Sequence, residues 1–438
     1  MDASSEAVRL LILGSMDEFV ELVQRARARG MYTVVCDGYD DGPAKAFADA
    51  AYTIDIRDVD ALVAVCQQER IDAVLSSFSD ILFESSCKLS HAAGLPTPCS
   101  LESLRFLRDK GAMKAMFSRL GIESPRSVLV REGFQDADIA QLHFPCVMKP
   151  LDGYGSRGVV VIDSPEEVRH VAVPAIASST GKEVLFEEYQ QGYEFNMTTW
   201  VFGGEVHVIS IADREKSIEI PGELPHVSRI VYPSIYFRQV APAARDIVQR
   251  IADYLDISEG PLSMQFFWTP ESGIQVCEVA GRLFGYEHEL VELSTGLALE
   301  DVLLDSVSDR AALQRRLQDH DPNRVVSYAC GLYFHAHEVV LDDMTAAQSL
   351  LQKRSDDSIT VVDSHFYYEA GQEVDHGAGA PPYLARVFLT APTRQVLDDE
   401  SRRMFAACKV PDTDGDNAVY TNKVASYEPV EVREAEQA

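Results

Sequence analysis

Short apolar runs alternate with helical patterns at the start of the chain. The apolar spacing predicts strands at 8–13, 31–36 and 73–75 and helices at 18–29 and 62–68. Strands that alternate with helices need crossover connections, which favour a parallel sheet. We therefore expect a Rossmann-like α/β domain over residues 1–98. A dinucleotide fingerprint is absent, since Gly14 is the one glycine after the first strand.

The pattern changes after Pro96 and Pro98. A helix is expected over about 109–120, where Gly121 follows as a typical residue after a helix C-terminus. Two short strands, 146–149 and 159–162, flank a glycine-rich loop, which indicates an antiparallel pair. This arrangement is typical of an α+β domain.

Strand and helix patterns continue to about residue 408. They predict strands at 184–186, 194–202, 205–212, 262–268 and 274–279, and helices at about 240–255 (following Pro242), 287–294 and 299–307. Beyond Pro411 the chain becomes polar and acidic, and a flexible acidic tail is expected at 428–438.

Composition narrows the class of protein. The 438 residues include 46% apolar and 25% charged residues, which is ordinary for a globular protein. The formal net charge of −30 argues against an electrostatic binder of DNA or RNA and against attachment to an anionic membrane. No apolar run approaches the roughly 18 residues of a spanning helix, and signal-peptide features are missing. The eight cysteines form no CxxC pair, so we expect buried thiols in the cytoplasm, with disulfides or metal ligands as the alternative.

Residues 148–158 carry the central chemical signal. Lys149 ends a predicted strand, and Gly153, Gly155 and Gly158 punctuate the loop that follows. Glycines let a backbone approach a phosphate with its N–H groups, and lysine adds a positive charge for the same oxygens. A Walker A loop is excluded because it requires a helix after the glycines. An ordinary flexible hairpin is the alternative.

Two further segments suit nucleotide and metal binding. The segment 187–194 follows a buried strand as a linker would, and its backbone could read an adenine edge; a solvated acidic loop is the alternative. Gln265 and Glu278 lie on two strands joined by a short turn and could face each other as oxygen ligands of Mg²⁺. Arg282 could neutralise charge on a transferring phosphoryl group, and a salt bridge at the rim is the alternative.

In order and spacing these elements resemble the ATP-grasp superfamily. The matching elements are Asp109-Lys110, Gly121–Pro125, Met148-Lys149-Pro150 with the glycine loop, Phe186–Tyr189, Gly192-Tyr193-Glu194, Gln265 and Glu278–Arg282. The resemblance covers residues 8 to about 310 and implies a multidomain fold of α/β and α+β type. Its parts would be the Rossmann-like domain (1–98), an ATP-grasp subdomain with the glycine-rich lid (99–192), an ATP-grasp core subdomain with the metal site (193–310) and a C-terminal α+β extension (311–427).

The resemblance also implies a role for each matching residue. The residues expected around the ATP phosphates are Lys110, Lys149, Gly153, Gly155, Ser156 and Gly158. Those expected around adenine are Glu187 and the backbone of Glu188, Tyr189 and Gln190, with Glu194 on the ribose. The expected metal ligands are Gln265 and Glu278. Arg282 and Lys149 are the expected catalytic residues, with Arg282 facing an acyl phosphate.

One position departs from the pattern. Many ATP-grasp enzymes carry E-x-N at the second metal strand, and Ala280 stands at the Asn position here. The stretch 278–282, with Gly285 and the segment 296–300 downstream, resembles the branch of bacterial L-amino acid ligases. The missing metal ligand could come from Glu271, Glu287 or a water.

Basic and polar residues outside these motifs are weaker candidates. Arg214 or Lys216, after a strand, could contact phosphate or substrate, and a solvated turn is the alternative. His288 could face substrate, although a structural hydrogen bond is the more ordinary role. Ser77, Ser79 and Asp80 follow the third predicted strand, where open α/β sheets bind ligands.

A metal site built on His335 and His337, which share one expected strand face, lacks a third nearby ligand.

The resemblance implies an ATP-dependent carboxylate–amine ligase that forms an amide through an acyl phosphate, with an amino acid as one substrate. ATP and Mg²⁺ would be the cofactors, with Mn²⁺ as an alternative metal. Partners would be small carboxylate and amine substrates and a second copy of the chain, not nucleic acid or membrane. The alternatives are a carboxylase-like or purine-pathway ligase of the same superfamily and a non-catalytic nucleotide sensor.

Overall fold

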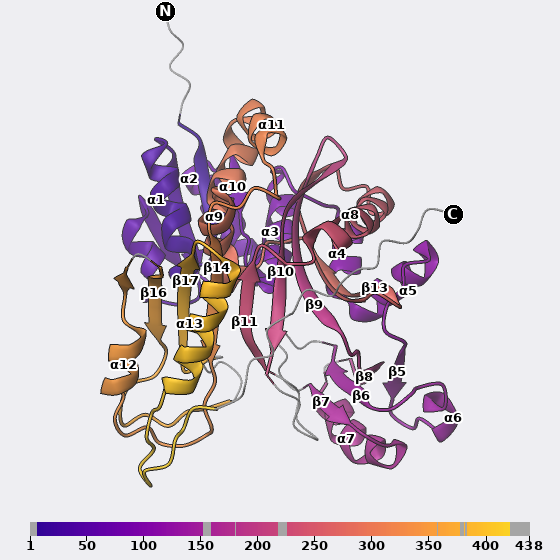
Figure 1. The fold of residues 1–438 in the computed structure, drawn as a ribbon. Coiled ribbons are helices and arrows are strands. Elements are labelled where there is room, and N and C mark those ends of the chain that lie inside the picture. The colour runs from indigo at the N-terminus through magenta and orange to yellow at the C-terminus, as the bar shows by residue number, and fades with distance from the viewer. Residues whose placement is uncertain are drawn as a thin grey trace, which may run out of the picture.

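The computed structural model describes residues 7–151, 159–179, 181–217, 226–356, 358–376, 381 and 383–420. It contains three sheets, which Figure 1 shows together with the helices that cover them. The predicted tail at 428–438 and the loop residues 152–158 lie outside the described residues.

The N-terminal domain is the predicted parallel α/β unit. Its strands are β1 (Arg9–Leu13), β2 (Tyr32–Asp37), β3 (Ala50–Thr53) and β4 (Ala73–Leu75), in the order β3-β2-β1-β4. Its helices are η1 (Asp17–Phe19), α1 (Val20–Ala28), η2 (Pro43–Phe47), α2 (Val59–Glu69) and α3 (Asp80–Ala93). All three strand pairs are parallel. Strand β3 was not predicted, because its sequence contains no apolar run. Its side chains are half-buried or exposed.

Two helices lead into the second part of the chain, α4 (Leu101–Arg108) and α5 (Lys110–Leu120). Ser100 accepts a hydrogen bond from the Ser103 amide at the start of α4. Helix α5 begins after Asp109, whose side chain accepts from the Ala112 amide at 2.9 Å, and ends at Gly121 with φ of 60°. A side-chain cap and a left-handed glycine are common helix-ending devices, so the predicted bounds of this helix were accurate.

A small antiparallel sheet follows, drawn at the lower right of Figure 1. Its strands are β5 (Ser127–Arg131), β6 (Cys146–Pro150), β7 (Val160–Ile162) and β8 (Glu183–Glu188), in the order β5-β8-β6-β7. Its helices are α6 (Asp136–Ile139) and α7 (Pro165–Ser178). The predicted pairing of β6 with β7 is confirmed, with Cys146 opposite Ile162.

The largest sheet has nine strands and joins the core subdomain to the C-terminal extension. Its order is β13-β12-β9-β10-β11-β14-β17-β16-β15, and its neighbouring strands pair in antiparallel orientation. The strands are β9 (Tyr193–Phe202), β10 (Glu205–Lys216), β11 (Val227–Tyr232), β12 (Glu259–Thr269), β13 (Gly273–Ala280), β14 (Tyr328–Phe334), β15 (Arg354–Ser355), β16 (Thr360–Phe366) and β17 (Ala385–Ala391). Strand β14, from the segment expected to form a separate extension, pairs directly with β11.

The helices around this sheet are α8 (Phe237–Tyr254), η3 (Gly285–Glu287), α9 (His288–Thr295), α10 (Leu299–Ser308), α11 (Arg310–Asp319), α12 (Thr345–Leu351) and α13 (Arg394–Ala407). The expectation that helix α8 follows Pro242 was wrong, because the helix begins at Phe237 and contains Pro242 in its second turn. The position of His335 and His337 on a strand face was also wrong, since β14 ends at Phe334.

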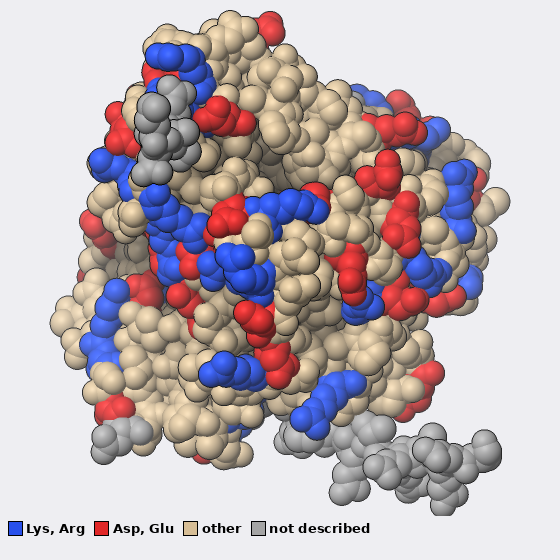
Figure 2. Space-filling view, turned by 90° about the horizontal axis from the view of Figure 1, so that it is seen from above, with Lys and Arg blue, Asp and Glu red and all other residues tan. Residues whose placement is uncertain are grey.

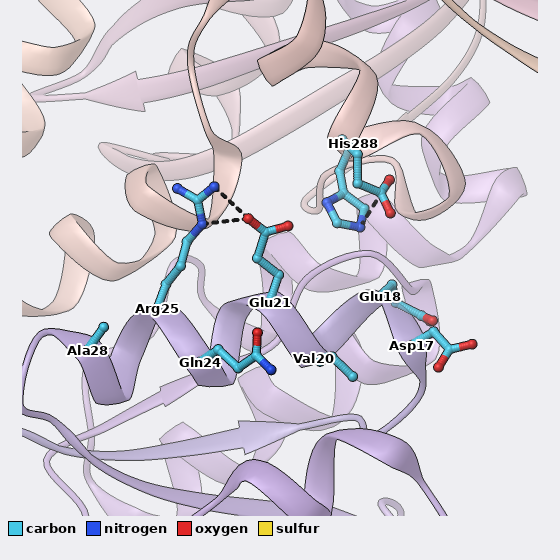
Figure 3. A pocket seen from close by; sticks show the side chains of 9 residues that line it. Asp17, Glu18, Val20, Glu21, Gln24, Arg25, Ala28 and His288 are labelled. Atoms are coloured by element: carbon cyan, nitrogen blue, oxygen red, sulfur yellow. Dashed lines mark hydrogen bonds and ion pairs between the residues drawn. The ribbon is translucent and has the colours of Figure 1, made fainter. Parts of the chain in front are cut away.

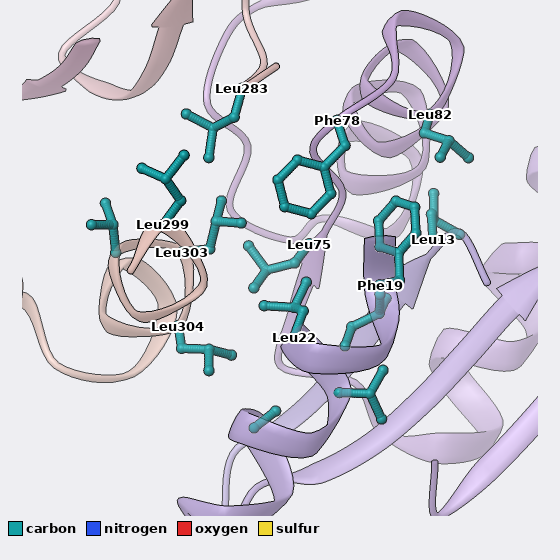
Figure 4. Close-up of a cluster of buried hydrophobic side chains, with 14 of the residues drawn as sticks. Leu13, Phe19, Leu22, Leu75, Phe78, Leu82, Leu283, Leu299, Leu303 and Leu304 are labelled. Atoms are coloured by element: carbon teal, nitrogen blue, oxygen red, sulfur yellow. The ribbon is translucent and has the colours of Figure 1, made fainter. Parts of the chain in front are cut away.

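One apolar core crosses from the N-terminal domain into the rest of the chain. Figure 4 shows Phe19 and Phe78 near Leu283 and Leu303, all of which belong to one buried cluster. The N-terminal domain is therefore packed against the segment that follows β13. Burial of apolar surface stabilises this interface at about 25 cal/mol per Å².

Charge is distributed in both signs over the surface. Figure 2 shows Lys and Arg side chains interspersed with Asp and Glu on the face seen from above. No helix within the described ranges is long and apolar enough to cross a membrane. All eight cysteines are free thiols, and Cys277 is half-buried while the others are buried.

Candidate nucleotide and phosphoryl-transfer site

Lys149 and Glu187 lie side by side on the small sheet. Val147 on β6 pairs with Glu187 on β8, and the neighbouring Met148 and Phe186 belong to the apolar core of this sheet. Because side chains alternate along a strand, Lys149 and Glu187 face away from that core. The Lys149 ammonium contacts a Glu187 carboxylate oxygen, and its Nζ lies 3.9 Å from the Sγ of Cys277 on β13.

A second ammonium shares this carboxylate. Lys114, one turn after Lys110 on α5, places its Nζ 2.6 Å from the other Glu187 oxygen, and the two side chains are 13% and 3% exposed. Burial alone would raise the pKa of Glu187, but Lys149 and Lys114 outweigh it and lower this pKa. Sequence reasoning missed Lys114, although its four-residue spacing from Lys110 on one helix face was an available signal.

Of the other predicted phosphate ligands, the structure describes Lys110. Lys110 opens α5, and its Nζ lies 3.4 Å from the carbonyl oxygen of Pro150, at the end of β6. The loop residues assigned to the phosphates lie outside the described residues, namely Gly153, Gly155, Ser156 and Gly158.

The segment expected to hold adenine leaves the end of β8. The amides of Glu188 and Tyr189 donate to the carbonyls of Arg126 and Pro145 at 2.9 and 3.0 Å. Base recognition by these two residues would therefore use their carbonyl groups rather than their amides. The Gln190 side chain donates to the Glu188 carbonyl at 3.2 Å.

Glu194, the predicted ribose ligand, is buried in a basic cluster. Arg214 Nε lies 2.8 Å from one carboxylate oxygen, Lys216 contacts the other, and Gln265 donates to the first. Burial raises the pKa of Glu194, but Lys216 and Arg214 more than offset it and lower this pKa. Arg214 and Lys216, two of the weaker candidates, thus lie beside predicted site residues.

Gln265 and Glu278 are direct cross-strand partners, as expected. The side-chain amide nitrogen of Gln265 donates to Glu194, so the Gln265 side-chain oxygen is the atom that could bind a metal. Glu278 is half-buried, and its side chain makes no hydrogen bond or ion pair with any described residue. One carboxylate and one amide oxygen fit Mg²⁺, which usually keeps several waters and phosphate oxygens in its shell.

Glu271 and Glu287, the two other candidate metal ligands, differ in their burial. Glu271 is exposed in the turn between β12 and β13. Glu287 is buried and accepts from Asn196 Nδ2 at 2.6 Å and from the Tyr232 hydroxyl at 2.7 Å. Burial raises the pKa of Glu287 despite these donors and Arg214. Within the described residues no group of three or more His, Cys, Asp or Glu side chains could hold a metal, and His335 instead bonds the Val227 carbonyl at 2.9 Å.

Arg282 is held by the N-terminal domain. Its Nε and Nη2 lie 3.1 and 3.0 Å from the two carboxylate oxygens of Asp80, in a forked arrangement. Burial raises the pKa of Asp80, and Arg282 more than offsets this and lowers it. The Leu283 amide donates to Ser77 Oγ at 3.0 Å. The end of β4 therefore fixes the loop that carries Arg282.

Close approach between these segments requires glycine at two positions. A Cβ on Gly281 would lie 2.3 Å from the Phe83 ring, and one on Gly285 would lie 2.7 Å from the Phe78 carbonyl oxygen. Larger residues would push the Arg282 loop away from the N-terminal domain. These close contacts explain why glycine is required at positions 281 and 285, which sequence spacing alone did not.

His288 packs between the two parts of the chain. Its ring stacks on Phe78 with 4.3 Å between centroids, and its nitrogens lie 2.6 Å from Glu300 and 3.4 Å from Glu289. Burial lowers the pKa of His288, but the two carboxylates outweigh it and raise it to about 9. The structural role weighed for this histidine therefore fits these contacts.

A cavity of about 490 Å³ lies between α1 and the start of α9. Figure 3 shows Glu21 of α1 and Glu18 of the preceding η1 on one side of it and His288 on the other. Its charged lining residues are Asp17, Glu18, Glu21, Arg25, His288 and Glu289. Arg25 is already paired with Glu21 at 2.5 Å and with Glu292 at 2.8 Å. The lining is therefore predominantly acidic.

The comparisons with known proteins define the class. The family described as the ATP-grasp domain matches residues 142–288, the segment that holds Lys149, Glu187, Gln265 and Arg282. Residues 142–288 thus form an ATP-grasp domain within the multidomain ATP-grasp fold, and members of this family are ADP-forming ligases.

Individual relatives differ in their named activities. The structure resembles the L-amino acid ligase from Bacillus licheniformis with a TM-score of 0.75 and 17% identity, over 93% of this chain and 99% of that one. It also resembles N5-carboxyaminoimidazole ribonucleotide synthetase from Thermotoga maritima, with a TM-score of 0.67 and 17% identity over 92% and 99%. In sequence, formate-dependent phosphoribosylglycinamide formyltransferase from Bacteroides thetaiotaomicron is 22% identical over 285 residues, or 63% of this chain and 70% of that protein.

Proposed function

We propose that this protein is an ATP-dependent carboxylate–amine ligase. The γ-phosphoryl group of ATP would pass to a substrate carboxylate oxygen, with cleavage of the bond between the γ-phosphorus and the β,γ-bridging oxygen, and give ADP and an acyl phosphate. An amine would then attack the acyl carbon and expel phosphate, which leaves an amide and releases a proton. Such chemistry needs positioning and charge neutralisation rather than a protein nucleophile.

The observation that carries this proposal is the forked pair of Arg282 and Asp80. It fixes a guanidinium just after the strand that bears Glu278, in the ATP-grasp segment 142–288 that also contains Lys149. A fixed cation there can stabilise the negative charge that develops on a transferring phosphoryl group. Because the carboxylate of Asp80 offsets its desolvation, the guanidinium can stay charged while half-enclosed.

Each site residue takes a specific part in the proposed reaction. Lys110 and Lys149 bind ATP phosphates, Glu187 and the following backbone hold adenine, and Glu194 holds the ribose. Gln265 and Glu278 hold Mg²⁺, which would neutralise phosphate charge when bound. Arg282 binds the phosphoryl group after it reaches the carboxylate.

An amino acid is the proposed substrate class. The likeness to an L-amino acid ligase supports it. We place the substrate ammonium group in the cavity beside α1, whose lining is acidic. A substrate ammonium group would be favoured there, because carboxylates attract cations in a partly enclosed site. A homodimer in the cytoplasm also stays a prediction, and one structural relative is named as a domain dimer.

A purine-pathway ligase is the second candidate function. It is favoured by the curated relatives, several of which are named formate-dependent phosphoribosylglycinamide formyltransferase. A phosphoribosyl substrate carries a phosphate dianion, which needs cationic side chains. The acidic cavity beside α1 offers Arg25 and His288, and both are already paired with carboxylates. Within this cavity the charge balance favours an ammonium group over a phosphate.

The test is ATP turnover with Mg²⁺ across amino acids, singly and in pairs, followed by phosphate release and by mass spectrometry of the products. Formate with glycinamide ribonucleotide serves as the competing substrate set. A new amide from an amino acid pair, with ADP and phosphate, would support the ligase. Turnover only with the ribonucleotide would support the second function, and ATP binding without turnover on either set would favour a nucleotide sensor.

A further inference from the structure

Glu187 is shared by two ammonium groups from different parts of the fold. Lys149 lies on β6 of the small sheet, and Lys114 lies on α5. Met113, Met116 and Phe117 of α5 pack in the same apolar cluster as strands β9 and β12. The ion pair between Lys114 and Glu187 therefore connects the core subdomain to the small sheet that carries Lys149.

The two lysines differ in their freedom to leave this carboxylate. Lys149 is the last but one residue of β6, just before the loop expected to cover the phosphates, and its side chain is 20% exposed. Lys114 lies inside α5, and its side chain is 13% exposed. A phosphate that enters the site would compete with Glu187 for Lys149, because a phosphate carries more negative charge than a carboxylate.

When Lys149 leaves Glu187, the carboxylate loses one of its two cations, and Lys114 remains as the other. Glu187 is 3% exposed, and a buried carboxylate without a cation is costly. Without Lys114, Glu187 would either retain Lys149 or take up a proton once Lys149 moves to phosphate. With Lys114 in place, the carboxylate keeps a cation throughout.

We propose that Lys114 is a positioning residue for nucleotide binding: it stays with Glu187 as the permanent counter-ion and thereby frees Lys149 to bind the phosphates of ATP. This inference rests on the proposed function only in that ATP is the ligand. It goes beyond that function because it assigns a role to a residue that would touch neither the base nor the phosphates.

The test is calorimetric titration of the full chain with ATP and Mg²⁺, in two buffers of different ionisation enthalpy at pH 6 and pH 7.5. We expect Lys114→Met to bind ATP about tenfold or more weakly. We also expect it to take up more protons on binding than the wild type, most clearly at pH 6. Lys114→Arg keeps the charge and should resemble the wild type in both respects.

A matched control is available on α3. Lys88 forms an ion pair of the same length, 2.6 Å, with Glu84, but these side chains are 50% and 28% exposed. Lys88→Met should leave both ATP affinity and proton uptake unchanged, since exposed pairs contribute little. If Lys114→Met does not fold, the double variant Lys114→Met/Glu187→Gln removes both charges, and its ATP binding should show no excess proton uptake.

The outcomes separate this role from a merely structural one. Wild-type affinity in Lys114→Met would overturn the inference. Weaker binding at both pH values with wild-type proton uptake would also overturn it, because Lys114 would then only tether the two subdomains. Failure of the wild type to bind ATP would refute the proposed function itself, and the inference with it.

Discussion

Arg394 on α13 offers a direct test of how the C-terminal extension supports the site. Its guanidinium lies 2.8 Å from Asp213, 2.5 Å from Glu215 and 2.9 Å from Asp398. Asp213 and Glu215 are on β10, where they alternate with Arg214 and Lys216, the two residues that contact Glu194. One face of β10 is therefore fixed by α13 while the other faces the candidate site.

The substitution Arg394→Met should be strongly destabilising. Asp213 and Glu215 are both fully buried, so the change leaves two carboxylates with fewer cations. Arg229 still pairs with Glu215 at 2.6 Å, and Ser234 still donates to Asp213 at 2.5 Å. Removal of one partner from a buried ion pair costs about 3–5 kcal/mol. Because these contacts survive, we expect Arg394→Met to lower the unfolding free energy by about 3 kcal/mol.

Urea unfolding followed by tryptophan fluorescence measures this loss. The two tryptophans, Trp200 and Trp268, lie on β9 and β12 of the same large sheet, so they report on its unfolding. Arg402→Met on the same helix is the matched control, because its pair with Asp399 is 2.5 Å long but 50% and 62% exposed. We expect the control to lose less than about 1 kcal/mol. Equal losses in the two variants would refute the reasoning.

Three further predictions concern the site and its support. Asp80→Asn should lower kcat/KM about 10- to 100-fold, since it weakens the charge-assisted hold on Arg282, while ATP binding measured by calorimetry stays near wild type; unchanged turnover would contradict this. Glu278→Gln should abolish turnover and leave ATP binding nearly intact, and full activity at ordinary Mg²⁺ would remove Glu278 from the metal site. The pKa of His288 is raised from 6.5 to about 9, so its stabilising charge is fully present below pH 6.5 and is lost as the pH rises through about 9. The charge of His288 contributes at most about 3 kcal/mol, and His288→Gln should flatten the decline in unfolding free energy over this pH range. The same change at the exposed His143 is the control variant.

Local sequence signals predicted helices and strands well where residues close in sequence define their ends. Helix α5 has a side-chain cap at Asp109 and a left-handed glycine at its end, and its bounds matched the prediction. The short turn between β12 and β13 placed Gln265 opposite Glu278. These features depend on residues close in sequence, so spacing was sufficient to find them.

Other predictions failed because neighbours in space overrode local preference. Pro242 was expected to precede a helix but lies in the second turn of α8, although proline there cannot donate a helical hydrogen bond. Strand β3 has no apolar run, and its place is fixed by pairing with β2. The partners of Lys114 and Arg282 are 73 and 202 residues away in sequence and could not be read from spacing.

The sequence by itself thus determined the alternation of strands and helices in the N-terminal domain, the parallel sheet that this implies and the set of ATP-grasp motifs. Only the tertiary structure decided which charges share a partner: Glu187 with two lysines, Asp80 with Arg282, and Arg394 with three carboxylates. The physical reason is that hydrophobic periodicity and turn chemistry act over a few residues, whereas the energy of a buried charge depends on every charge near it in space.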